Sequence, residues 1–177
     1  MTRHVAFLRG VNLGRRQTKS ADLVKVFEGL GYSGVKTLIA SGNVLFDTDS
    51  PRGLQAAIEG ALGKQFGFDI GVVLRSIDEL RAMIAADPFG KVDAAADVAR
   101  HVLMFAQPLK PKPKLADVPG DYEVARIDTR DIYFVVHKKP DGTYLGRSAL
   151  GEVDKLLAGA GLSTMRNWNT IEKAAGK

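Results

Sequence analysis

Four short apolar runs alternate with two helical patterns along the first 75 residues, and this order constrains the fold more than any other feature. The runs predict β-strands over residues 4–9, 35–40, 44–47 and 70–74. The first helical pattern repeats apolar residues at i, i+3, i+4 and i+7, and it consists of Leu23, Val26, Phe27 and Leu30. The second pattern follows the third run and consists of Leu54, Ile58, Ala61, Leu62 and Phe66. The predicted order is therefore β-α-β-β-α-β.

Local signals predict where the two helices begin and end. Ser20 is expected to cap the first helix, because a serine oxygen accepts the free N–H groups of a first turn, and Gly31 is expected to end it. Ser50 is expected to cap the second helix, with Pro51 at the first helical position, where a missing N–H costs nothing. Both helices are therefore expected to start at a serine.

The order β-α-β-β-α-β is that of the ferredoxin-like arrangement, an antiparallel sheet with the first and third strands at its centre. In such a sheet the first two strands run the same way, with the third strand reversed between them. The loop after the first strand and the turn after the second then share one edge. We therefore expect Arg9, Asn12, Ser41 and Asn43 to be neighbours.

The second half predicts a smaller α+β part. Ser76 and Glu79 form a capping box, which begins a helix that must stop near Asp87 and Pro88. Strands are expected over residues 101–106, 122–127 and 131–137, an extended connector over 108–114, and a final helix over 150–158. The second and third of these strands are expected to form a hairpin. The fold class is thus α+β, with a ferredoxin-like first part over residues 1–75 and a second part over 76–177 packed against it as one compact unit.

Composition excludes several classes of function. The chain has 177 residues and no cysteine, which excludes disulfides, thiol catalysis and thiolate metal sites. No apolar run approaches the roughly 20 residues of a membrane span, so no membrane partner is expected and the cytoplasm is the expected location. The histidines, His4, His101 and His137, lack the spacing of metal ligands, so neither a metal nor a cofactor is expected.

The net charge of +5 is concentrated in residues 1–20. That segment holds five basic residues and no acidic residue, whereas the rest of the chain carries 20 of each. A basic cluster attracts phosphates, carboxylates or nucleic acid. The alternative is a solvated surface that keeps the protein in solution.

Three polar motifs carry a resemblance to a known family. They are Phe-Leu-Arg-Gly-Val-Asn-Leu-Gly at 7–14, Ala-Ser-Gly-Asn-Val at 40–44 and Arg-Asn-Trp-Asn-Thr at 166–170. Together they resemble the bacterial domain-of-unknown-function 1697 family over essentially the whole chain. The resemblance implies a two-part α+β protein whose first part is ferredoxin-like, and it implies no established biochemical role. Arg15 and Arg16 depart from the family pattern, in which a loop richer in glycine or lysine is expected.

The loop from Arg9 to Gly14 is the main candidate site. Its two glycines permit positive φ, and it precedes a helix N-terminus, where free N–H groups attract anions. It is neither a P-loop nor a Gly-x-Gly-x-x-Gly loop, because the required spacings are missing. The alternative is a tight turn in which Asn12 bonds its own backbone and Arg9 pairs with an acid.

The third motif has two readings as well. Trp168 can stack on a base or sugar while Asn167 and Asn169 bind polar edges. Alternatively, Asn169 and Glu172 cap the last short helix, and Trp168 anchors the chain end in the core.

The favoured function is the binding of an anionic small molecule or nucleotide at the strand edge. The expected ligand-binding residues are Arg9, Asn12, Arg15, Arg16, Ser41, Asn43, Arg166, Asn167, Trp168 and Asn169. One alternative is an enzyme acting on a phosphorylated or carboxylated metabolite, for which the sequence identifies no catalytic residue. The other is a nucleic-acid-binding protein, since Phe7 and Phe46 lie on the two central strands and three lysines follow Pro108. The oligomeric state is left open.

Overall fold

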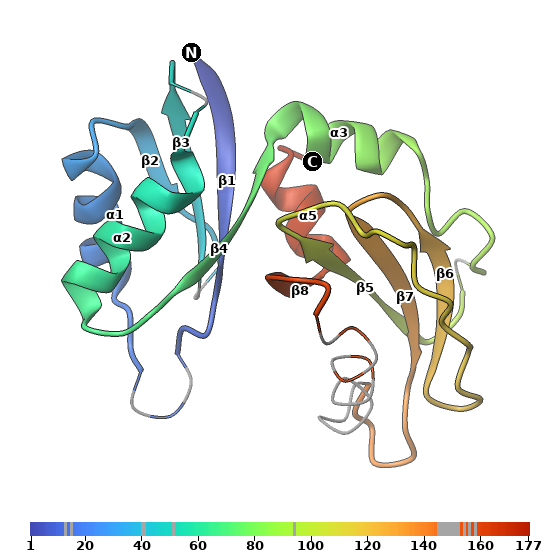
Figure 1. The fold of residues 1–177 in the computed structure, drawn as a ribbon. Coiled ribbons are helices and arrows are strands. Elements are labelled where there is room, and N and C mark those ends of the chain that lie inside the picture. Colours follow the sequence, from blue (N-terminus) through green and yellow to red (C-terminus); the bar gives the residue numbers. More distant parts are fainter. Residues whose placement is uncertain are drawn as a thin grey trace. The chain divides into compact units, whose positions relative to one another are not determined.

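The computed structural model describes residues 1–12, 14, 16–39, 42–50, 52–93, 95–144, 153, 155, 157 and 159–177. The chain divides into two compact units (Figure 1). The first unit consists of Met1–Ala82 with Glu172–Lys177, and the second consists of Met83–Ile171. Each unit contains one four-stranded antiparallel sheet, so the fold class is α+β as predicted.

The first unit has the predicted element order. Its elements are β1 (Thr2–Arg9), α1 (Ser20–Gly29), β2 (Ser33–Thr37), β3 (Asn43–Thr48), α2 (Leu54–Phe66) and β4 (Gly71–Ser76). The strand order is β2-β3-β1-β4, with β1 and β3 at the centre, which is compatible with the ferredoxin-like arrangement. All three strand pairs are antiparallel, so β1 and β2 run in the same direction.

One face of this sheet packs against both helices (Figure 1). Because side chains alternate along a strand, Ala6 and Leu8 of β1 share this face with Phe46 of β3. The apolar stripes predicted from the sequence meet them, through Phe27 of α1 and Ile58 of α2, both fully buried. Each such side chain contributes about 1.5–3 kcal/mol of apolar burial.

Both predicted helix caps are wrong. Ser20 is the first residue of α1 and Lys19 is its N-cap, because the N–H groups of Asp22 and Leu23 already bond to the Lys19 carbonyl. The α2 helix begins at Leu54, after Gly53 in the left-handed region with φ 69°, so Ser50 lies outside it. Pro51 is not among the described residues.

In the second half, α3 (Ile77–Ala85) starts with the predicted capping box. The Ser76 N–H donates to Glu79 Oε2 at 2.7 Å, and the Glu79 N–H donates to Ser76 Oγ at 3.1 Å. The sheet of the second unit contains β5 (Val98–Phe105), β6 (Tyr122–Ile127), β7 (Asp131–His137) and β8 (Ser163–Asn167), and α5 (Trp168–Ala174) follows. The first three strands and the β6–β7 hairpin were predicted, and β8 was not. The helix predicted over 150–158 lies mostly outside the described residues.

The second sheet repeats the strand order of the first. Its order is β6-β7-β5-β8, so β5, β6, β7 and β8 correspond to β1, β2, β3 and β4. The backbone bonds correspond as well: Leu8 N–H donates to the Gly42 carbonyl at 2.7 Å, and Phe105 N–H donates to the Arg130 carbonyl at 2.8 Å. One difference is that the link between β5 and β6 contains no helix in any of its residues, all of which are described. The two units are thus variants of one topology.

Each face of the second sheet carries an apolar cluster. Leu103, Phe105 and Phe134 belong to the larger cluster on one face. On the opposite face, Tyr133 packs edge-on against Phe89 and Trp168, with ring centroids 5.8 and 6.0 Å apart.

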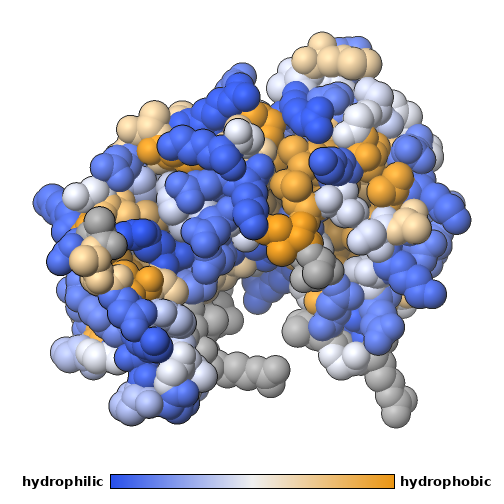
Figure 2. Space-filling model, turned by 180° about the vertical axis from the view of Figure 1, so that it is seen from behind, coloured by the Kyte–Doolittle hydropathy of each residue, from blue (hydrophilic) through white to orange (hydrophobic). Residues whose placement is uncertain are grey.

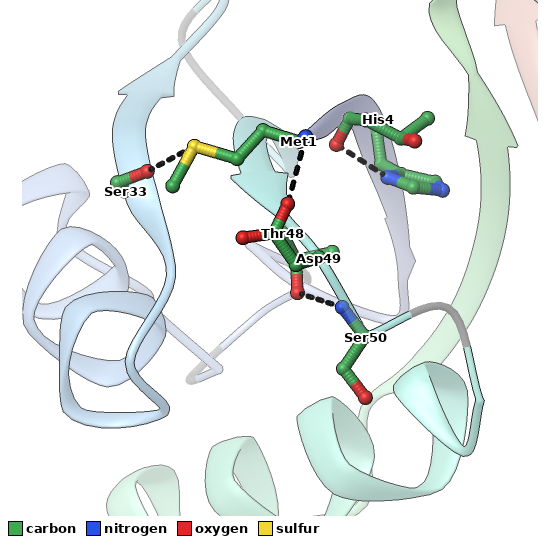
Figure 3. Close-up of polar contacts among 7 residues, drawn as sticks. Met1, His4, Ser33, Thr48, Asp49 and Ser50 are labelled. Atoms are coloured by element: carbon green, nitrogen blue, oxygen red, sulfur yellow. Dashed lines mark hydrogen bonds and ion pairs between the residues drawn. The ribbon is translucent and has the colours of Figure 1, made fainter.

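The chain start is held at one end of the first sheet (Figure 3). The Met1 ammonium lies 2.7 Å from Asp49 Oδ1, and this hydrogen bond raises the pKa of the ammonium. The Ser33 hydroxyl contacts the Met1 sulfur at 3.8 Å, and the Ser50 N–H donates to Thr48 Oγ1 at 3.1 Å. Polar groups at this end of the sheet therefore satisfy one another.

Hydrophilic residues cover much of the face seen in Figure 2, with apolar patches between them. Among the described residues, the large hydrophobic side chains with the greatest exposure are Met1 and Ile39. Within the same part of the chain, no helix is both long and apolar enough to cross a membrane.

Candidate functional site

The candidate site lies at the edge where β1 ends and β3 begins. The Leu8 N–H donates to the Gly42 carbonyl at 2.7 Å, and Phe7 pairs with Asn43 in the β1–β3 register. The loop after β1 and the turn before β3 therefore lie side by side, as the topology predicts. We call the described residues of these two segments, 9–18 and 38–43, the β1–β3 edge.

The backbone of this edge uses conformations that favour glycine. Gly10 has φ 78° and Gly42 has φ 78°, both in the left-handed region. Asn12 also has a positive φ of 56°, which asparagine tolerates better than most residues. Positive φ values of this kind also occur in the backbone nests that bind anions.

Two described arginines, Arg9 and Arg16, belong to the segment around Gly10. Arg9 is the exposed last residue of β1. The Arg16 guanidinium lies over the Phe68 ring, with Cζ 5.2 Å from the ring centroid, and its Nη1 would be 3.7 Å from a Cβ placed on Gly10. Arg16 makes no ion pair with any described residue, so its charge stays available at this edge. Arg15 is outside the described residues.

The two asparagines hold the turns. Asn12 Oδ1 accepts the Thr18 N–H at 3.0 Å, so its side chain closes the loop six residues ahead. Asn43 is only 4% exposed, and its Nδ2 donates to the Leu38 carbonyl at 3.1 Å. Ser41, which was predicted beside them, is outside the described residues. Asn12 is exposed, and its Nδ2 has no hydrogen-bond partner in the described part of the chain.

The four predicted residues of the third motif lie in the second unit. Trp168 is 8% exposed and packs edge-on against Phe89, as in the alternative where it anchors the chain end. Asn167 Oδ1 accepts the Asn169 N–H at 2.9 Å, so Asn167, rather than Asn169, bonds at the start of α5. Arg166 Nη1 donates to Thr164 Oγ1 at 2.6 Å, and burial lowers the pKa of Arg166 to about 10.

The aromatic residues of the two central strands do not form a stacking platform. Phe7 and Phe46 alternate to opposite faces of the first sheet, because Phe46 is in register with His4 and Phe7 with Asn43. Phe46 is fully buried, with its ring stacked on Tyr32 at 4.8 Å. Bases therefore have no paired aromatics to stack on at this sheet.

Comparison with known proteins places the chain in a family. The match to DUF1697, described as a protein of unknown function, covers residues 1–133. The chain belongs to the DUF1697 family. Its fold is similar to the solved structure of the conserved bacterial protein SP0830 from Streptococcus pneumoniae, with a TM-score of 0.66 at 18% identity over 98% of this chain and 97% of that one. No curated protein matches the chain.

The family match bears on two of the three motifs. It includes the first two motifs, at 7–14 and 40–44, and ends before the third at 166–170. The matched residues thus contain both segments of the β1–β3 edge. The structural similarity extends over nearly the whole chain, and at this identity it concerns the fold alone.

Sequence reasoning missed one polar pair. His137 Nε2 lies 2.8 Å from Glu123 Oε1, on the neighbouring strands β7 and β6. The predicted hairpin contained the signal, because a turn at 128–130 pairs Glu123 with Val135 and makes His137 its diagonal neighbour on the same face. In the described part of the chain, no three His, Asp or Glu side chains gather to hold a metal ion.

Proposed function

We propose that this DUF1697 protein binds an anionic small molecule or nucleotide at the β1–β3 edge. The observation that carries the proposal is the position of Arg16, whose guanidinium folds back to Gly10 and has the Phe68 ring, not a carboxylate, beneath it. An arginine held over a ring is oriented before a ligand arrives, and less side-chain entropy is then lost on binding.

Different residues of the edge have different roles in the proposal. Arg9 and Arg16 supply charge, with Arg15 as the third arginine of the same loop. The Asn12 amide nitrogen supplies an orienting donor, since only its oxygen is bonded to Thr18. Asn43 bonds to the Leu38 carbonyl and so holds the backbone beside Gly42. In this proposal Arg9, Arg16 and the Asn12 nitrogen contact the ligand, whereas Asn43 and the Asn12 oxygen hold the loops in shape.

Binding is favoured over catalysis by the contacts of these residues. Neither Asn12 nor Arg16 contacts a histidine or a carboxylate in the described part of the chain. A general acid or base must lie within hydrogen-bond reach of the reacting group. The proposal therefore concerns a ligand that is held, not one that is converted.

Calorimetric titration with inorganic phosphate, AMP and ATP tests the proposal. We expect saturable binding of at least one probe, and Arg16→Ala should weaken it by about tenfold or more, since a charge-assisted bond is worth about 1.5–3 kcal/mol. Arg81→Ala is the matched control, because Arg81 is an exposed arginine of α3 whose ion pair with Asp78 is 3.5 Å long.

Two results would overturn the proposal. One is the absence of saturable binding for all three probes. The other is an equal loss in Arg16→Ala and Arg81→Ala, which would indicate unspecific attraction to net positive charge. A single-stranded RNA whose affinity falls steeply with salt and far exceeds that of ATP would instead favour the nucleic-acid alternative.

A further inference from the structure

A groove of about 590 Å³ opens on the second unit, far along the chain from the β1–β3 edge. Small-molecule sites commonly have volumes of about 300–1,000 Å³. The floor of the groove is apolar and comes from one face of the sheet, through Val98 of β5, Val135 of β7 and Ala125 of β6. The segment that follows α3 forms the other wall, including Pro88 and Val92.

Part of the charge around the groove is already neutralised. His137 and Glu123 pair at 2.8 Å. Arg126 pairs with Asp128 through Nε at 2.7 Å, and its Nη1 donates to the Ala86 carbonyl at 3.2 Å. The Arg126–Asp128 ion pair therefore adds little net charge for a ligand to meet, whereas the partner of the Glu123 carboxylate is a histidine, which is charged only when protonated.

Charges of both signs remain on the opposite wall. Lys91 makes no ion pair with any described residue, and the same holds for Asp87. Asp93 lines the groove too, and its Oδ1 accepts only the Ala95 N–H at 2.8 Å. On this wall a ligand therefore meets one cation, Lys91, and two carboxylates, those of Asp87 and Asp93, that have no ion-pair partner among the described residues.

The backbone at Asp87 is fixed by hydrogen bonds on both sides. Asp87 has a positive φ of 43°, uncommon for a residue with a side chain. Its N–H donates to the Ile84 carbonyl at 3.1 Å, and its own carbonyl accepts the Gly90 N–H at 3.2 Å. A Cβ on Gly90 would collide with the Asp87 carboxylate. The carboxylate can therefore occupy its position only because residue 90 is a glycine. Such backbone strain is commonly found at functional sites.

We propose that this groove binds a zwitterionic small molecule of the amino-acid or dipeptide class. The ligand carboxylate faces Lys91, its ammonium faces Asp87 and Asp93, and its apolar side chains cover Val98, Ala125 and Val135. A purely anionic ligand would meet two unpaired carboxylates, and a purely cationic one would leave Lys91 without a counter-charge. Only a ligand with both charges matches both groups.

Titration followed by ¹⁵N NMR tests this proposal, with leucyl-leucine as the probe. We expect saturable shifts of the Val98, Ala125 and Val135 amides. N-acetyl-leucyl-leucine, which lacks the ammonium, and leucyl-leucine methyl ester, which lacks the carboxylate, should each bind about tenfold more weakly or worse.

Variants assign the two charges separately. Lys91→Met should weaken leucyl-leucine but leave the methyl ester unchanged, and Asp87→Asn should weaken leucyl-leucine but leave the N-acetyl form unchanged. Asparagine tolerates the positive φ of Asp87, so that variant keeps the turn. Lys25→Met, at an exposed position of α1, is the matched control and should bind as the wild type does.

Three outcomes would overturn the proposal. The first is no saturable shift of these amides at millimolar dipeptide. The second is equal affinity for the free and blocked dipeptides. The third is equal weakening of all three probes by Lys91→Met. Because the monitored amides all belong to the second unit, these outcomes are distinct from a failure of phosphate binding at the β1–β3 edge.

Discussion

Asn43 and Asp131 are polar residues at equivalent points of the two sheets, and both are nearly buried. Asn43 opens β3 and is 4% exposed, and Asp131 opens β7 and is 8% exposed. In each case the carbonyl of that residue accepts the N–H of the residue just after the preceding strand, Leu38 or Asp128, at 2.8 Å. Buried polar side chains are kept where they form hydrogen bonds, as Asn43 does with the Leu38 carbonyl. At the residue scale, the backbone carbonyls of both residues close the turns, and the Asn43 side chain adds a second bond to its own turn.

Glycine substitutions should have opposite effects at two positions. Gly34 has φ 58°, and a Cβ there would collide with the Asp47 carboxylate, which pairs with Arg3 at 3.1 Å. Gly34→Ala should therefore cost about 1–3 kcal/mol of unfolding free energy. Gly60, inside α2, has open space at its Cβ position, so Gly60→Ala should stabilise by about 0.4–1 kcal/mol. Urea unfolding measures both, and the same sign for both would contradict the argument.

Trp168 should act as a core residue. It packs against Phe89 at 5.2 Å and Tyr133 at 6.0 Å. Trp168→Ala should cost about 3–5 kcal/mol in urea unfolding, and Trp168→Phe should cost less because it keeps an aromatic ring in the cluster. The emission of this single tryptophan should be blue-shifted in the folded protein. A cost below about 1 kcal/mol for the alanine variant would show that the cluster is not a core.

At the element scale, short polar signals fix where helices begin only when the backbone agrees with them. The Ser76–Glu79 box works because both reciprocal bonds form, at 2.7 and 3.1 Å. Ser20 and Ser50 have the same chemistry but do not cap, because the carbonyl of Lys19 already begins α1 and Gly53 enters α2 from the left-handed region. The backbone conformation at Lys19 and Gly53, rather than the nearby serines, therefore decides where α1 and α2 begin.

The α3 capping box can be tested with a matched pair. Glu79→Ala removes the side chain that accepts the Ser76 N–H, so it should cost about 0.5–2 kcal/mol in denaturant unfolding. Glu79→Gln keeps an acceptor at the same distance and should lose clearly less. If alanine and glutamine were equivalent, the reciprocal bond would contribute nothing to the stability of α3.

At the scale of the whole molecule, one strand topology occurs twice, with different connections between the strands. The first unit connects its first two strands through α1, whereas the second connects β5 to β6 without a helix. At the turn before the third strand, the first unit has Gly42 and the second has Arg130, whose Nη2 donates to the Ala106 carbonyl at 3.2 Å. At this turn of the second unit, the Arg130 guanidinium therefore bonds to backbone carbonyls at the end of β5.

The stability of the protein should fall in mild acid because of His101. Its Nδ1 is buried and has no hydrogen-bond partner among the described residues, and burial lowers the pKa of the ring below 6.5. The folded state then binds fewer protons than the unfolded state, so this contribution is present above pH 6.5 and is lost as the pH falls toward the folded pKa. Urea unfolding at pH about 7.5 and about 5.5 should show a smaller pH loss for His101→Phe than for the wild type. Equal losses in the two proteins would remove His101 as the cause, and His137→Gln is the control.

The sequence by itself determined the local elements. Apolar residues at the helical period gave α1 and α2, and short apolar runs gave seven of the eight strands. The missed strand, Ser163–Asn167, has polar residues at four of its five positions, so it lacks the apolar pattern that marks the others. Local periodicity is readable because the core face of an element repeats within a few residues.

Only the tertiary structure decided which polar and aromatic side chains are buried or paired within the protein and which are exposed to a ligand. The sequence predicted both Arg16 and Trp168 as ligand-binding residues, yet the Arg16 guanidinium lies over Phe68 at an exposed edge and the Trp168 indole lies in an aromatic cluster. The groove at Lys91 and Asp87 likewise brings together residues 87–98 and residues 123–137, which are far apart in the sequence. Burial and pairing depend on residues distant in the chain, and no pattern within a short window contains that information.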